Sequence, residues 1–231
     1  KQTLQLKNII NSMKPEKSKQ INFSIDDTKK TINAIFKNFD QDNGGLGGAP
    51  KFPNEPVMRF LIDQNFPEAK EIIKLSFEKM LQGGLFDHIE GGFFRYCVDI
   101  DWTIPHYEKM LYNSAQLIEL YSLIYQSNKN KRINDSIYLT IKWLTKTMQS
   151  EGGGFFASMD ADSNNDEGNM EEGAYYNWSL EELKKFLTPA EFLELTNNFY
   201  LDGEPNYEGK KWHLNLKSFA GVAKFKNIRE K

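Results

Sequence analysis

The sequence predicts an all-α fold of about three antiparallel helical hairpins, which together form part of an (α/α)6 toroid. Apolar residues recur at helical spacing through five successive segments between residues 24 and 149. Long connections rich in glycine and aromatic residues alternate with short polar turns. Because alternate connections of an antiparallel array lie at alternate ends, we expect all the long loops on one face.

The first helix is predicted to begin at Ser24, since Asp27 three residues later completes a capping-box pattern. We expect it to end in the following glycine-rich segment, where Gly44 and Gly45 stop it.

The second helix is predicted from about Asn54 to Gln64, and the third from Pro67 to about Gln82. The fourth is predicted to begin near Pro105, because proline is tolerated in a first turn. The fifth is predicted from about Lys131 to Gln149.

Beyond the fifth helix we expect minor β structure between residues 153 and 178. Two capping-box pairs, Ser179 with Glu182 and Thr188 with Glu191, then predict two short helices.

The composition describes a globular protein rather than a disordered one, with 39% hydrophobic and 13% aromatic residues. A net charge of −3 argues against a nucleic-acid partner. No apolar run approaches the roughly 18 residues of a membrane-spanning helix, so we expect no membrane partner. The single cysteine, Cys97, excludes an internal disulfide and fits a reducing compartment, so we expect a cytoplasmic protein.

Charge is distributed unevenly along the chain. Residues 1–30 carry seven lysines against three acids, and residues 210–231 carry seven basic residues against one acid. The middle of the chain, which holds the glycine-rich loops, is therefore acidic. This pattern fits either a solvated surface or a cleft for a neutral polyol or a cation.

Four long strings carry a family resemblance: GGLGGAPKFP, GGFFRYCVDIDWTIPHYEKMLYNSAQL, GGGFFASMDADS and EEGAYYNW. They resemble the YyaL-like family of thioredoxin-domain-containing proteins, which includes spermatogenesis-associated members, over about Thr28 to Leu216. The resemblance implies a toroid similar to N-acylglucosamine 2-epimerase and the six-hairpin glycosidases. It also implies an upstream thioredoxin-like domain and a second half of the toroid, both outside this chain.

On this resemblance, residues 1–20 are expected to be a connector or the remnant of an upstream domain. Residues 21–231 are expected to be the N-terminal half of the toroid domain. Half a toroid would expose apolar helix faces, so we expect self-association through them. The family usually has a histidine where this chain has Phe94, and it tends to have glutamine and an extra glycine where this chain reads His88-Ile89-Glu90-Gly91.

The candidate catalytic residues are His106, Lys109 and Glu108 at the start of the fourth predicted helix, together with Asp87. His106 and Lys109 would share a helix face. Histidine suits a base that works near neutral pH, and lysine could hold an enolate. The alternative is that His106 satisfies a buried carbonyl and that Glu108 and Lys109 form a structural charge pair.

Several acids share the loop after the third helix. Two carboxylates about 5–10 Å apart would suit glycoside hydrolysis. The alternative is that Arg95 pairs with Asp99 or Asp87 and braces the loop. The residues expected to bind substrate are Arg95, Tyr96, Trp102, His88, Asp99, Lys51, Asp160 and Asp162.

The acidic segment after the fifth helix has the spacing of a calcium loop, with glycine replaced by Asn165 at its sixth position. Its candidate ligands are Asp160, Asp162, Asn164, Asp166 and Glu171. The alternative is an acidic surface loop, and otherwise we expect no metal or other cofactor.

We therefore expect a sugar or polyol site of the epimerase or isomerase type on the loop face, incomplete in this chain alone. The alternative is a non-catalytic interaction module, coupled to a thioredoxin-like domain in redox or protein quality control.

Overall fold

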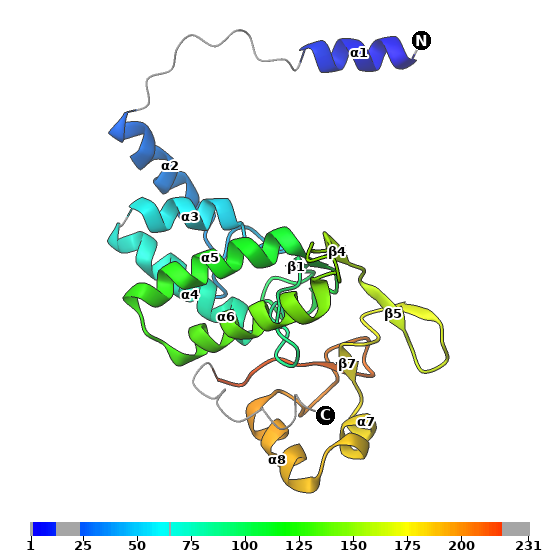
Figure 1. Ribbon diagram of the computed structural model, residues 1–231. Coiled ribbons are helices and arrows are strands. Elements are labelled where there is room, and N and C mark those ends of the chain that lie inside the picture. Colours follow the sequence, from blue (N-terminus) through cyan, green and yellow to red (C-terminus); the bar gives the residue numbers. More distant parts are fainter. Residues whose placement is uncertain (1, 13–23, 65, 219–231) are drawn as a thin grey trace. The chain divides into compact units, whose positions relative to one another are not determined.

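The computed structural model (Figure 1) describes residues 2–12, 24–64 and 66–218. The chain divides into two compact units, residues 1–37 and residues 38–231. The predicted connector over residues 1–20 falls partly outside the described residues. No helix within the described ranges combines the length and apolarity needed to cross a membrane.

The first unit contains helices α1 (Gln2–Ser12) and α2 (Ile25–Lys37). The capping box at the start of α2 is confirmed, because Asp27 N donates to Ser24 Oγ at 3.2 Å and Ser24 N donates to Asp27 Oδ2 at 3.0 Å. The predicted end of this helix is wrong, because α2 ends at Lys37, well before Gly44.

The second unit is built on four helices, α3 (Glu55–Gln64), α4 (Pro67–Gln82), α5 (Leu111–Ser127) and α6 (Lys131–Trp143), the last continued by a π-helical turn over Leu144–Met148. Helix α3 packs against α4 and α5, and α5 packs against α6 (Figure 1). Their facing sides form a buried apolar core that includes Met58, Leu61, Phe77, Leu117 and Tyr121.

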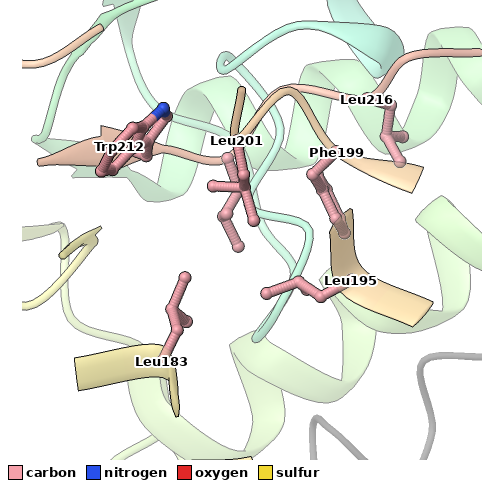
Figure 2. Packing of buried hydrophobic residues seen from close by; sticks show 7 residues of the cluster. Leu183, Leu195, Phe199, Leu201, Trp212 and Leu216 are labelled. Carbon is pink, nitrogen blue, oxygen red and sulfur yellow. The ribbon is translucent and has the colours of Figure 1, made fainter. Parts of the chain in front are cut away.

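Two short helices follow, α7 (Leu180–Phe186) and α8 (Pro189–Asn198). Each begins with the capping box that the sequence predicts. Figure 2 shows Leu183 of α7 and Leu195 of α8 beside the segment that carries Trp212. This second apolar cluster comprises Leu183, Leu195, Phe199, Leu201, Trp212, Leu214 and Leu216.

Within the part of the chain that the structure describes, short strands pair in four antiparallel ribbons. These are β1 (Tyr96–Cys97) with β2 (Pro105–His106), β3 (Lys109–Met110) with β4 (Ser158–Met159), β5 (Asp162–Asn164) with β6 (Met170–Glu172), and β7 (Asn177–Trp178) with β8 (Trp212–His213). The sequence predicts β structure only over residues 153–178, so the strands β1 to β3 and β8 lie outside the predicted range.

The predicted helix start at Pro105 is wrong, because α5 begins at Leu111. His106 lies opposite Tyr96, and Lys109 lies opposite Met159. Pairing with other parts of the chain therefore holds residues 105–110 extended and overrides the helical signal of the proline.

The long loops gather on one face, as the alternation of connections predicts. Lys51 and Cys97 exchange backbone hydrogen bonds of 2.7 and 3.0 Å, which join the first long loop to the second. The β3–β4 ribbon and the bond from Leu111 N to Ala157 O, 2.9 Å, join the second to the third. Gly45 allows this approach, since its φ is +76° and a Cβ there would lie 2.7 Å from the Trp102 ring.

Candidate functional site

The half-exposed imidazole of His106 lies at the centre of a polar cluster on the loop face. Its Nδ1 is 2.6 Å from Glu172 Oε1, and its Nε2 is 3.9 Å from Glu108 Oε2. Arg95 Nη1 donates to the same Glu108 oxygen at 2.9 Å. We call Arg95, His106, Glu108 and Glu172 the His106 cluster.

Two ribbons bring the His106 cluster together. The β1–β2 pairing places Tyr96 opposite His106, and the β5–β6 hairpin carries Glu172. The imidazole stacks on the Tyr96 ring at a centroid distance of 5.1 Å, and Tyr96 stacks on Phe52 at 4.6 Å. The cluster is therefore flanked by a partly exposed aromatic surface.

Alternate residues of this extended segment point to opposite sides. His106 and Glu108 are partly exposed, whereas Tyr107 and Lys109 are buried. This is the period-two pattern of extended backbone, in which residues an odd number of positions apart face opposite ways. The expectation that His106 and Lys109 share a helix face is therefore wrong.

Lys109 is fully buried and pairs with Asp87. Its Nζ lies 2.7 Å from Asp87 Oδ2 and donates to Gly91 O at 3.0 Å. The ammonium also lies 4.9 Å from the ring centroids of Phe94, Trp143 and Tyr176. Buried in this way, Lys109 and Asp87 brace the glycine-rich loop, and Phe94, where the resemblance expects a histidine, forms part of the enclosure.

The predicted pairings within the loop are corrected accordingly. Glu108 pairs with Arg95 rather than with Lys109, and Arg95 pairs with neither Asp99 nor Asp87. The predicted partners of Arg95 are therefore wrong, because its partner Glu108 lies in the segment before β3 rather than in the acidic part of the loop.

Lys51 and Trp102, both expected to bind substrate, are fully buried. Lys51 Nζ donates to Asp40 Oδ2 at 2.6 Å and to Ile100 O at 2.8 Å, while Trp102 Nε1 donates to Asn43 O at 2.9 Å. Although burial opposes ionisation, hydrogen bonds from Lys51 and from the Asn43 backbone lower the pKa of Asp40 to about 2. These side chains fasten the first two long loops to each other.

Asp99 closes the turn between β1 and β2. Its carboxylate accepts from Thr103 N at 2.8 Å and from Ile104 N at 2.5 Å. Burial, together with hydrogen bonding to Asp101, raises the pKa of Asp99 to about 6. His88 is buried as well, with Nε2 2.9 Å from Gly83 O.

Asp160 and Asp162 are exposed and lie at the start of the β5–β6 hairpin, which projects from the rest of the second unit (Figure 1). Asn165 Oδ1 accepts from the backbone N–H groups of Glu167 and Asn169, and so closes the hairpin turn. In the described ranges, no three His, Cys, Asp or Glu side chains come close enough together to hold a metal ion. The calcium spacing therefore coincides with the turn of a β-hairpin.

The sequence reasoning missed Glu172, although it is the nearest partner of His106. The two residues are 66 positions apart, so no local pattern connects them. The only signal was the string EEGAYYNW, which contains Glu172.

No protein-family model matches the chain. Among curated proteins, it is 35% identical over 158 residues to spermatogenesis-associated protein 20 of Mus musculus, covering 64% of this chain and 20% of that protein. The Homo sapiens protein of the same name is 34% identical over 158 residues, with the same coverage. An uncharacterized protein of Caenorhabditis elegans, B0495.5, is 37% identical over 193 residues, covering 78% of this chain and 26% of that protein.

Solved sugar epimerases are also similar to the chain. The crystal structure of a sugar epimerase from a ruminal bacterium gives a TM-score of 0.49 at 20% identity, over 56% of this chain and 37% of that one. Cellobiose 2-epimerase from Bacillus thermoamylovorans gives 0.48 at 14% identity, over 58% and 40%.

The chain spans about a fifth to a quarter of the length of the curated relatives that it matches. Over the matched residues it is a homologue of spermatogenesis-associated protein 20, as the resemblance of its glycine-aromatic strings predicts.

Proposed function

We propose that the His106 cluster is the acid/base part of a site for a sugar or related polyol, with proton transfer of the epimerase or isomerase type. The observation that carries the proposal is the half-exposed imidazole of His106, held by Glu172 at 2.6 Å and stacked on Tyr96. A histidine oriented by a carboxylate is the usual form of a general base near neutral pH.

The Glu172 contact would set the tautomer. With the Nδ1–H of His106 donating to Glu172, Nε2 keeps its lone pair and can take a proton from a carbon beside a sugar carbonyl. The C–H electron pair then moves into the enolate, and the proton returns to the same carbon. If the planar enolate first turns its opposite face to the imidazolium, the returning proton inverts that carbon, and the reaction consumes no other reagent.

Arg95 is the group in the cluster best suited to stabilise the enolate oxygen. Its guanidinium is partly exposed and has several N–H donors, of which Nη1 is directed to Glu108. This assigns to Arg95 the electrostatic role that the sequence suggested for Lys109, whose ammonium is enclosed by Asp87 and three aromatic rings. The exposed ring of Phe52 would offer its outer face to the apolar side of a sugar, while Tyr96 lies stacked between Phe52 and His106.

The test is hydrogen exchange at the carbon beside the carbonyl. Because the resemblance implies that the site is completed by a second toroid half, a panel of reducing mono- and disaccharides is incubated in D2O with a protein that carries both halves, and deuterium incorporation is followed by NMR. We expect incorporation for at least one sugar, and a fall of about 10²- to 10⁴-fold in His106→Gln, the usual contribution of a general acid/base. Glu119→Gln, an exposed acid on α5, is the matched control and should exchange at the parent rate. No exchange with any sugar, or an equal rate in His106→Gln, would contradict the proposal.

A second candidate is an interaction module coupled to a thioredoxin-like domain. This candidate is favoured by the burial of Lys51, Trp102 and Lys109. The sequence offers them as catalytic or substrate-binding residues, but in the structure they fasten loops together. In that case no sugar should shift the thermal unfolding midpoint, whereas a thioredoxin-like domain added in trans should raise it. The opposite pair of results would reject this candidate.

A further inference from the structure

A cavity of about 460 Å3 lies beside the second apolar cluster. The rings of Tyr175, Tyr176 and Trp178 contribute to its lining, and so do the side chains of Leu183, Leu195 and Leu214. The volume falls within the range of about 300–1000 Å3 that is typical of small-molecule pockets with mostly apolar walls. No member of the His106 cluster lines it, so it is a separate site.

Most of the polar groups in this lining already have partners. Asp87 is paired with Lys109, and the Nε2 atoms of His88 and His213 lie 2.9 Å from the carbonyl oxygens of Gly83 and Gly84. These groups therefore contribute shape rather than net charge to the cavity.

Two charged residues of the lining remain without a charged partner. Lys146, on the π-helical turn, is exposed and forms no ion pair with another described side chain. Glu90 accepts a hydrogen bond from the Tyr175 hydroxyl at 3.0 Å, but no described cation lies within ion-pair distance of it. The cavity thus combines an apolar, aromatic interior with one cation and one anion.

We propose that this cavity binds a zwitterion with an apolar ring, of the class of the aromatic α-amino acids. The ring would lie against the aromatic and leucine side chains, the carboxylate would pair with Lys146, and the ammonium would pair with Glu90. A ligand with one charge alone would leave the other protein charge unpaired, and would be repelled by the residue of like sign.

Three indole ligands separate the two charges. Tryptophan has both, indole-3-propionate has only the carboxylate, and tryptamine has only the ammonium. Calorimetry on the chain should show that tryptophan binds up to about fivefold more tightly than indole-3-propionate or tryptamine. Each of these two ligands lacks one ion pair, and a partly exposed ion pair contributes up to about fivefold in affinity. Equal affinity of all three, or tighter binding of either single-charge ligand, would overturn the proposal, as would no binding of tryptophan at millimolar concentration.

Variants assign each charge to its residue. Lys146→Met should remove the advantage of tryptophan over tryptamine, and Glu90→Gln, which keeps an acceptor for Tyr175, should remove its advantage over indole-3-propionate. The matched control is Lys142→Met, since Lys142 is an exposed residue of α6 outside the lining. This variant should leave both affinity advantages of tryptophan unchanged. Ile89→Trp should fill the cavity and weaken all three ligands. If Lys142→Met acted like Lys146→Met, or if Ile89→Trp left binding intact, the ligand would not occupy this cavity.

Discussion

The Nζ atom of Lys109 lies 2.7 Å from Asp87 Oδ2, although the lysine side chain is 0% and the aspartate side chain 6% exposed. The pair joins the two ends of the glycine-rich loop between α4 and α5. Asp87 also accepts from the backbone N–H groups of Ile89 at 2.8 Å and Glu90 at 3.1 Å. A loop with little regular structure is thereby held by one buried ion pair and its hydrogen bonds.

Removing one member of this pair should be costly. Lys109→Met leaves the Asp87 carboxylate buried and unpaired, and should lower the free energy of unfolding by about 3–5 kcal/mol in urea denaturation. The double variant Lys109→Met with Asp87→Leu should be more stable than Lys109→Met alone, since it removes the orphaned charge. Lys142→Met, on the exposed side of α6, should change stability by less than about 0.5 kcal/mol. A cost under about 1 kcal/mol for Lys109→Met would show that the pair does not brace the loop.

Gly92 and Gly153 form a matched pair for testing close packing. Both have positive φ, +85° and +84°, but a Cβ at Gly92 would lie 2.7 Å from the Trp143 ring, whereas one at Gly153 would have nothing within 4 Å. Gly153→Ala should therefore cost about 1 kcal/mol from backbone strain alone. Gly92→Ala should cost at least about 1 kcal/mol more, because it adds a steric clash. Equal unfolding free energies for the two variants would contradict the packing of Gly92 against Trp143.

The Lys51–Asp40 pair should make stability depend on acid pH. The pKa of Asp40 is lowered from 3.8 to about 2, so the unfolded chain binds more protons between these values. The stabilisation is complete above pH 3.8 and is lost as pH falls toward 2, a change on the order of 2 kcal/mol. The difference in unfolding free energy between the parent and Asp40→Asn should narrow across this window. A constant difference would mean that the pair does not shift this titration.

His213 should make the free energy of unfolding depend on pH in a higher range than Asp40 does. Burial lowers its pKa from 6.5 to about 4, so the unfolded chain again binds more protons between these values. Its contribution to stability is complete above pH 6.5 and decreases by about 2–3 kcal/mol as pH falls toward 4. Asp99, with its raised pKa, has the opposite pH dependence in part of this window, so the comparison should be made with His213→Gln. The loss on acidification should be smaller in that variant, and an equal loss would rule out His213 as its source.

Local signals predict that the helices exist, and they predict the bounds of some of them. Helix α4 has the predicted bounds, and the capping boxes at Ser179 and Thr188 begin helices as expected. Hydrophobic periodicity and capping depend on residues within a few positions, so one sequence contains them. The alternation of loops likewise predicted the convergence of the long loops.

The site was harder to predict because its contacts are distant in sequence. Residues 105–110 are extended because they pair with Tyr96 and Met159, and neither pairing can be read from the proline that suggested a helix. The sequence offers Lys109 as a catalytic candidate because its burial against Asp87 and three rings depends on tertiary packing, which no local pattern shows. His106 is partly exposed, as a base that meets substrate must be, but its partner Glu172 comes from the β5–β6 hairpin.

The most direct test of the proposed site follows the three histidine side chains by NMR during titration with the sugar panel. His106 is half-exposed, while His88 and His213 are buried with Nε2 close to a carbonyl oxygen. A sugar bound at the His106 cluster should shift the imidazole signals of His106 and leave those of His88 and His213 unchanged, and His106→Gln should weaken its binding. Binding that leaves the His106 signals unmoved, or no binding of any sugar, would contradict the account.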